Sequence, residues 1–137
     1  MIKISKVLSA NDLGLTGSHQ SGMLVPKRPE ILGFFPYLDA EEKNPRCRVM
    51  FRDGKGDEWK FNYIYYNNAL FGGTRNEYRL TGMTRFFREF SPKPGDSLIL
   101  SKSEESYQID ISKTSNKEEE SFKLVIRQTS SWKVVRI

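Results

Sequence analysis

CRVMFRDGKGDEWKFNYIYY, residues 47–66, is the stretch that decides the fold. Apolar and polar residues alternate in the runs Cys47–Phe51 and Glu58–Tyr66, and a period of two is typical of strands with one buried face. Between them lies Asp53-Gly54-Lys55-Gly56, whose glycines tolerate the positive φ of a tight hairpin turn. The stretch therefore predicts a β-hairpin.

The rest of the chain extends this pattern. Further short runs of the same kind are Ile2–Leu8, Met23–Val25, Ser97–Ser101, Tyr107–Ile111, Phe122–Arg127 and Trp132–Ile137. Two segments are predicted to be helical, Pro29–Phe35 and Thr81–Phe90. In the second, Met83, Phe86, Phe87 and Phe90 recur at three- and four-residue spacing, which predicts an apolar face that closes an open barrel. We therefore expect a mainly β fold with two short helices.

The composition fits one globular domain with a moderate preference for a polyanion. The 137 residues include 22 Lys+Arg against 17 Asp+Glu, which gives a net charge of +5. The one cysteine, Cys47, cannot form an internal disulfide, and the N-terminus has no signal-peptide apolar core. No apolar stretch has the length of a membrane helix. We expect a cytoplasmic protein that does not bind membranes.

Two polar segments exceed what simple connections between strands require. The first, Ser9–Gly22, contains Asn11, Thr16, Ser18, His19 and Gln20, whose donors and acceptors suit phosphates and base edges. Its glycines permit close approach of the backbone to a ligand. The alternative is a glycine-rich surface loop stabilised by its own side-chain turns.

The second segment, Asn67–Arg79, matches the hydrogen-bonding code of the DNA major groove. Arginine can fork onto guanine, asparagine onto adenine, and glutamate can accept from cytosine, so Arg75, Asn76, Glu77 and Arg79 form a candidate reading set. Either arginine could instead contact phosphate. The remaining alternative is an internal salt-bridge cluster of Arg75 and Arg79 with Glu77.

Two strings within these segments resemble a known family. LSANDLGLTGSHQSGMLVP, residues 8–26, and IYYNNALFGGTRNEYRLTG, residues 64–82, resemble the N-terminal DNA-recognition domain of EcoRII-type restriction endonucleases. Pro94-Gly95-Asp96 is similar to the Gly-Asp turn of plant B3 transcription-factor domains. The resemblance implies a seven-stranded open pseudobarrel with two short flanking helices, which grips the major groove between two arms at about 9–22 and 67–79.

The resemblance also implies a binding site, a partner and a source. The implied DNA-binding residues are Asn11, Thr16, Gly17, Ser18, His19, Gln20, Lys27, Asn67, Asn68, Gly73, Thr74, Arg75, Asn76, Glu77, Tyr78 and Arg79. The chain departs from EcoRII at Leu24, Ala69, Gly73 and Tyr78, so individual contacts do not carry over. The retained arginines and glutamate make the CCWGG site of EcoRII the first candidate for the target. We expect residues 1–137 to be one recognition domain of a larger bacterial or archaeal type II restriction endonuclease, binding double-stranded DNA as a monomer.

Catalysis is expected to belong to a separate nuclease domain, with no metal or cofactor in this chain. Two other functions stay open. Asp39, Glu58 and Lys60 loosely imitate the Mg²⁺ site of a small nuclease. Alternatively, Tyr63, Tyr65, Tyr66 and Phe71 could stack on the bases of single-stranded DNA or RNA.

Overall fold

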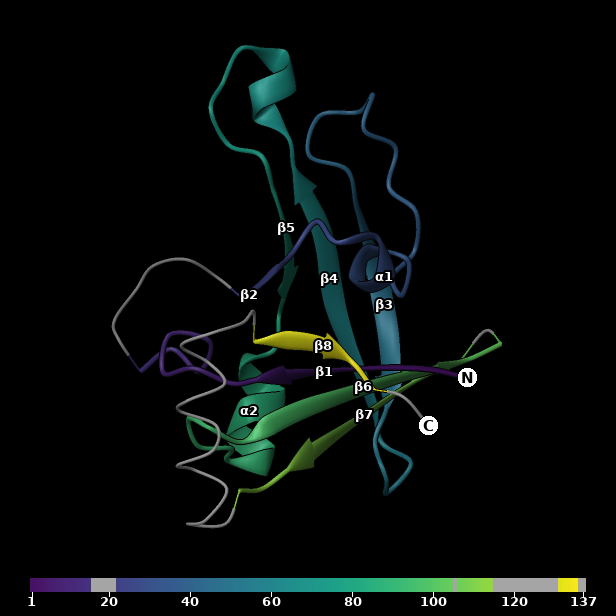
Figure 1. The fold of residues 1–137 in the computed structure, drawn as a ribbon, viewed down its shortest axis with the longest axis vertical. Coiled ribbons are helices and arrows are strands. Elements are labelled where there is room, and N and C mark those ends of the chain that lie inside the picture. The colour runs from purple at the N-terminus through teal and green to yellow at the C-terminus, as the bar shows by residue number, and fades with distance from the viewer. Residues whose placement is uncertain (16–21, 105, 115–130, 136–137) are drawn as a thin grey trace.

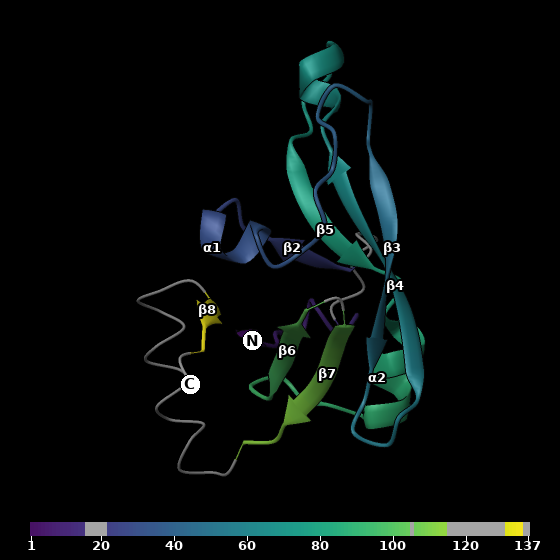
Figure 2. The ribbon, with the colours of Figure 1, turned by 90° about the vertical axis from the view of Figure 1, so that its right-hand side faces the viewer.

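One curled sheet of eight strands forms an open half-barrel (Figures 1 and 2). The computed structural model describes residues 1–15, 22–104, 106–114 and 131–135. Its strands are β1 Ile2–Val7, β2 Met23–Val25, β3 Arg46–Arg52, β4 Glu58–Tyr66, β5 Glu77–Thr81, β6 Ser97–Ser103, β7 Ser106–Ser112 and β8 Trp132–Val134. The helices are α1 Pro29–Leu32, the 3-10 helix η1 Asn68–Phe71 and α2 Thr84–Phe90. The strand order is β2-β5-β4-β3-β7-β6-β1-β8, and β3–β7 is the parallel pair.

The predicted hairpin is confirmed as β3–β4. Cys47 lies opposite Tyr63 and Arg52 opposite Glu58, in antiparallel register. Gly56 adopts a φ of 90°, which the turn requires and glycine tolerates. The buried Asp53 carboxylate accepts hydrogen bonds from the Lys55 and Asp57 amides and from the Trp59 indole. These bonds fix the turn, and the one from Trp59 contributes most to lowering the pKa of Asp53.

The core fills the inside of the half-barrel, and α2 covers one end of it. Phe51, Phe61 and Leu100 are fully or almost fully buried in this core. Phe86 of α2 is also fully buried, with its ring edge-on to Trp59 and Phe61. The predicted apolar face of this helix is therefore confirmed.

Three details of the expected fold were wrong. The resemblance implied seven strands, whereas the described sheet has eight: β5 lies in a segment that was expected to be an arm, and β8, within the predicted run Trp132–Ile137, pairs with β1 at the edge of the sheet. Helix α2 begins at Thr84 rather than Thr81, because Thr81 belongs to β5 and Gly82 turns the chain with a φ of 80°. Helix α1 ends at Leu32, before the predicted end at Phe35. The predicted strand at Phe122–Arg127 lies outside the described residues.

The Gly-Asp turn locks the start of β6 against the end of β1. Gly95, with a φ of 97°, donates its amide to the Leu8 carbonyl, and the Leu8 amide donates to the Asp96 carbonyl. The buried Asp96 carboxylate accepts from the amides of Lys93 and Thr114. Burial opposes ionisation of Asp96, but these bonds and Lys113 outweigh it and lower its pKa. The turn is therefore a structural junction.

Candidate functional site

The β4–β5 hairpin carries the second polar segment. Figure 1 shows this hairpin extending beyond the neighbouring strands, with the η1 turn at its far end. The Asn68 side chain accepts from the Arg75 amide at 2.6 Å, and the Asn68 carbonyl accepts from the Gly73 amide at 2.7 Å. Gly72 ends η1 in the left-handed region, with a φ of 92°. These bonds give the tip a defined backbone.

Asn67 joins this tip to the link between α1 and β3. Its side chain is 0% exposed and donates to the carbonyls of Ala40 and Glu42, at 3.1 and 2.8 Å. Its amide oxygen accepts from the Asn44 backbone at 2.6 Å, and the Asn44 side chain accepts from the Asn67 backbone. With these bonds made, Asn67 supports the tip instead of facing solvent.

An ion-pair cluster lies between the tip and β5, and it joins Arg75 to Glu77 and Arg79 on one face of that strand. Glu77 Oε1 accepts from Arg75 Nε at 2.7 Å and from Arg79 Nε at 3.1 Å. The Arg75 guanidinium also lies over the Tyr66 ring, 3.7 Å from its centroid. The internal cluster that the sequence left open as an alternative is therefore present.

The cluster is partly withdrawn from water. Side-chain exposure falls from 39% for Arg75 to 24% for Glu77 and 7% for Arg79. Burial tends to raise the pKa of Glu77, but the two guanidinium groups outweigh it and lower that pKa. Glu77 is therefore ionised at neutral pH, and with two arginines the cluster has a net charge of +1.

A row of stacked rings supports the hairpin on its other face. Tyr78 stacks on Tyr65 with centroids 4.1 Å apart, and Tyr63 stacks on Phe35 at 4.5 Å. The Tyr65 hydroxyl donates to the side chain of Asn76 at 2.7 Å. The row stiffens β4 and β5 and fixes one end of the Asn76 amide.

The first polar segment is anchored at both of its described ends. Asp12 forms an ion pair with the buried Lys6 of β1 and accepts a hydrogen bond from the Ser9 amide, so it supports this segment from within. At the other end, Gly22 has a φ of 72°, and a Cβ there would lie 2.1 Å from the Leu80 carbonyl oxygen. Gly22 therefore allows the backbone to approach β5.

The structure brings the two polar segments together at β2 and β5. Leu24 lies opposite Arg79 in the sheet, and Arg79 donates to the Gly22 carbonyl at 3.3 Å. The predicted site residues Thr16, Gly17, Ser18, His19 and Gln20 lie outside the described residues.

Exposure divides the other predicted site residues into three groups. Asn11, Lys27, Gly73, Thr74 and Asn76 are exposed; Asn68, Arg75, Glu77 and Tyr78 are half-buried; Asn67 and Arg79 are buried. The most buried members hold the site in shape, and the exposed members surround the cluster.

The structure does not assemble the alternative nuclease site. Glu58 is the first residue of β4. Asp39 lies near the other end of this strand, because the carbonyl of its neighbour Ala40 accepts a hydrogen bond from Asn67, which directly follows β4. At about 3.3 Å per residue, these ends of β4 are roughly 25 Å apart. Glu58 is paired with Arg52 at 3.3 Å. Within the described part of the chain, no group of three or more His, Cys, Asp or Glu residues is arranged to hold a metal ion.

Most of the aromatic rings considered for stacking on single-stranded bases are buried or already packed against other side chains of the protein. Tyr63 is 1% exposed and Tyr65 is 7% exposed, and both belong to the stacked row. Tyr66 is covered by Arg75, which leaves Phe71, 46% exposed at the tip. The described rings therefore do not form a continuous platform for bases.

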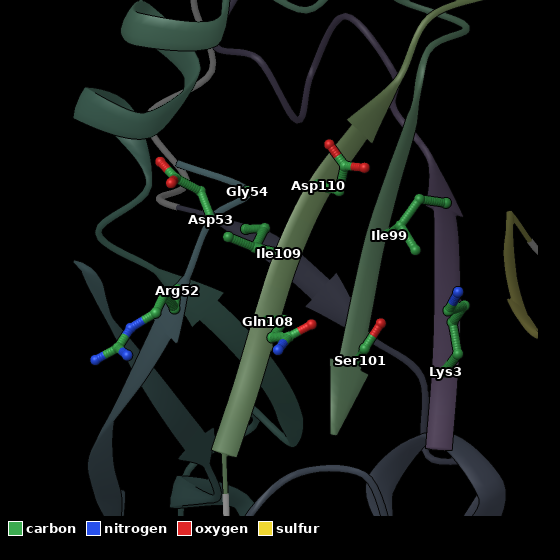
Figure 3. A pocket seen from close by; sticks show the side chains of 9 residues that line it. All are labelled: Lys3, Arg52, Asp53, Gly54, Ile99, Ser101, Gln108, Ile109 and Asp110. Atoms are coloured by element: carbon green, nitrogen blue, oxygen red, sulfur yellow. The ribbon is translucent and has the colours of Figure 1, made fainter. Parts of the chain in front are cut away.

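A separate polar hollow of about 430 Å³ lies on the outer face of β1, β6, β7 and β3 (Figure 3). Lys3, Ser101, Gln108 and Arg52 form one row across these strands, because each lies opposite the next in the sheet. Asp110 and Asp53 lie on one side of the row (Figure 3). The hollow contains none of the predicted site residues.

Membrane spanning by a helix finds no support, because no described helix is long and apolar enough to cross a bilayer.

The curled sheet with its two short helices defines a B3-like fold. The solved structure of an Arabidopsis FUS3–DNA complex matches it with a TM-score of 0.62 and 24% sequence identity, covering 81% of this chain and 96% of that one. The chain belongs to the family of the N-terminal domain of restriction endonuclease EcoRII, whose family model matches residues 1–121.

Two curated proteins share part of the sequence. The type II restriction enzyme EcoRII of Escherichia coli is 39% identical over 79 residues, which is 56% of this chain and 19% of that enzyme. A rice protein (Oryza sativa subsp. japonica) described as containing AP2/ERF and B3 domains is 38% identical over 102 residues, which is 72% of this chain and 29% of that protein. The chain thus spans less than a third of either relative.

The strand character of the central site residues was not predicted from the sequence. Glu77, Arg79 and Thr81 alternate with Tyr78 and Leu80 in β5. This alternation, together with the β-forming Tyr78 and Thr81, is the signal that identifies the strand.

Proposed function

We propose that this chain recognises a specific sequence in double-stranded DNA and serves as the target-recognition domain of a type II restriction endonuclease. The observation that carries the proposal is the cluster formed by Glu77 and Arg79 of β5 with Arg75, which precedes that strand by two residues. Arginine forks onto guanine N7 and O6, and glutamate accepts from cytosine N4. Two comparisons support this proposal. The chain belongs to the EcoRII N-terminal family, and a solved structure with the same fold is that of a FUS3–DNA complex.

The cluster suits base reading because its side chains are held in place before any ligand arrives. Glu77 binds the Nε group of both arginines, and Tyr66 supports the Arg75 guanidinium from below. The terminal amino groups of Arg75 have no hydrogen-bond partner among the described residues, so they can donate to a base. Side chains that are already ordered lose less entropy on binding.

The surrounding residues would complete the interface. We assign the exposed Lys27, Gly73, Thr74 and Asn76 to contacts around the cluster, and Asn11 to the first arm. From the sequence alone, Thr16, Gly17, Ser18, His19 and Gln20 belong to that arm as well. Asn67, Asn68 and Tyr78 would act mainly by holding the second arm in shape.

We further propose that this chain binds DNA as a monomer without cutting it, and that cleavage belongs to another domain of a longer protein. The separation of Asp39 from Glu58 along β4 supports this division. Incubation of the purified chain with plasmid DNA and Mg²⁺ tests it. We expect intact plasmid, and Mg²⁺-dependent nicking that Glu58→Ala abolishes would contradict it.

Selection of bound duplexes from a random pool, followed by sequencing, tests the main proposal. We expect enrichment of one short motif containing G·C pairs, with CCWGG as the first candidate. A selected duplex should also outcompete its own single strands. A pool that gains no common motif over successive rounds would refute sequence recognition.

A further inference from the structure

The outward face of β3 carries arginine at Arg46, Arg48 and Arg52, and all three are exposed. Arg52 is neutralised by Glu58 across the hairpin, at 3.3 Å. Arg48 has no ion pair or hydrogen bond with another described residue, and Arg46 has only a long bond of 3.4 Å to the Asn44 carbonyl. Two of these three charges therefore lack an acidic partner in the described structure.

These two arginines lie on the same face of the sheet as the ion-pair cluster. Arg46 is opposite Ile64 on β4, and Ile64 is opposite Arg79 on β5. Arg48 is opposite Asn62, which is opposite Thr81. Residues directly opposite each other in a sheet point to the same side. Figure 2 shows β3, β4 and β5 running side by side along this part of the molecule.

The sheet geometry sets how far the pair lies from the cluster. Across two strand spacings of about 4.8 Å each, Arg46 lies roughly 10 Å from Arg79 and roughly 12 Å from Glu77, whereas Arg48 lies roughly 12 Å from Arg79 and roughly 16 Å from Glu77. The DNA major groove is about 12 Å wide, so its edge runs roughly 6 Å from its centre and the sugar–phosphate backbone lies beyond that edge. When the cluster faces the bases, Arg46 and Arg48 therefore lie beyond the groove edge, on the side of the phosphate backbone.

We infer that Arg46 and Arg48 bind the phosphate backbone of the DNA strand that borders the groove read by β5. This inference rests on the proposed function. It adds a second track of contact on β3, outside both recognition arms. Phosphate is the ligand because the two side chains are unpaired, fully charged and beyond the reach of the base edges. In this arrangement, β5 reads the sequence and β3 sets the position of the duplex.

The salt dependence of DNA binding measures this contact. Log affinity falls linearly with log salt concentration, and each phosphate contact adds about 0.9 to the magnitude of that negative slope. The double variant Arg46→Gln/Arg48→Gln should therefore lower the magnitude of that slope by about 1.8. The ratio of affinities for selected and random duplexes should stay unchanged, because phosphate contacts carry no sequence information.

Two matched variants control the experiment. Arg52→Gln removes a charge from the same strand and face, but from a residue that is already paired with Glu58. It should change the magnitude of the slope by less than about 0.45, which is half the value of one phosphate contact. Arg46→Lys/Arg48→Lys keeps both charges and should retain most of the slope. Thermal unfolding of each variant checks that the fold is intact.

The outcomes separate this inference from the proposed function. If the wild type binds its selected duplex but the glutamine double variant keeps the full slope, β3 does not contact phosphate and the inference is wrong. If Arg52→Gln lowers the slope as much as the double variant does, the effect is general surface charge, which also overturns it. A wild type that binds no duplex overturns both proposals.

Discussion

Substitution of Glu77 by alanine tests the centre of the site, because this carboxylate connects two arginines. Glu77→Ala removes the acceptor of Arg75 Nε at 2.7 Å and of Arg79 Nε at 3.1 Å. We expect two separable effects. The fold loses an ion-pair cluster, and DNA binding loses a side chain that accepts from cytosine and holds both guanidinium groups in position.

The exposure of the three side chains sets the size of the first effect. Breaking a fully buried ion pair costs about 3–5 kcal/mol, whereas an exposed pair contributes about 0–1 kcal/mol. Glu77 is 24% exposed, between a 7% exposed Arg79 and a 39% exposed Arg75. We therefore expect a loss of about 2 kcal/mol in the free energy of unfolding, which a domain with a typical stability of about 5–15 kcal/mol survives.

The second effect is a loss of specificity. A lost base-reading pair costs about 1–3 kcal/mol against the selected site, or roughly 5- to 150-fold in affinity. Affinity for random duplex should change little. Fluorescence anisotropy at one fixed salt concentration gives the ratio of the two affinities, and thermal unfolding gives the stability of the same preparation.

Glu58→Ala is the matched control, because Glu58 is a glutamate on β4 that also forms an ion pair with an arginine, Arg52 of β3. It lies at the opposite end of β4 with a half-exposed side chain, so neither stability nor specificity should change by more than about 0.5 kcal/mol. An unchanged affinity ratio for both Glu77→Ala and Arg75→Ala would refute the reading role of β5.

Three further predictions concern what holds the site together. Gly22→Ala should destabilise the fold by about 2–4 kcal/mol, because its φ is 72° and a Cβ would meet the Leu80 carbonyl; thermal unfolding measures this loss, and a neutral variant would contradict the close approach. Asn67→Ala should cost about 2–4 kcal/mol, because it leaves the carbonyls of Ala40 and Glu42 without their donors; hydrogen exchange should show the loss first in the link between α1 and β3. Asp96→Asn should destabilise the fold at pH 7, and the difference in stability from the wild type should shrink as the pH falls below 3.8, the ordinary pKa of aspartate. The reason is that the pKa of Asp96 is lowered in the folded protein. The ionised carboxylate therefore stabilises the fold fully above pH 3.8, and this stabilisation is lost as the pH falls through the folded pKa. Unfolding measured from pH 7 to pH 2 tests this last prediction, and a difference that grows on acidification would refute it.

The strands with strict alternation were predictable from the sequence, because burial of one sheet face is a local pattern. The run Glu58–Tyr66 coincides with β4, and Met23–Val25 coincides with β2. The turn at Asp53–Gly56 was equally clear from its glycines. Only the resemblance, however, predicted that Ser9–Gly22 and Asn67–Arg79 act together, since they meet through pairing of β2 with β5 that no local pattern specifies.

The roles of individual site residues were less predictable, because they depend on neighbours distant in sequence. Asn67 is buried by partners 23 to 27 residues away, and Arg79 donates to Gly22 across 57 residues. The sequence offers hydrogen-bonding groups at both positions, but it does not reveal which groups the fold itself already uses. Burial therefore identifies Asn67 and Arg79 as residues that support the site, and Arg79 combines this support with its proposed place in the reading set.

Arg79 has a structural role that Arg75 lacks, although both bind the same carboxylate. Arg79 is buried and bridges Glu77 on β5 to the Gly22 carbonyl at the end of the first polar segment. Arg75 instead lies near the tip, where the Tyr66 ring supports it. Loss of Arg79 therefore disturbs the junction of both arms and the reading set together. Loss of Arg75 removes a reading group while the β2–β5 pairing stays in place. Because of this difference, Arg75→Ala is the variant that tests the proposed recognition chemistry without disturbing the architecture that presents it.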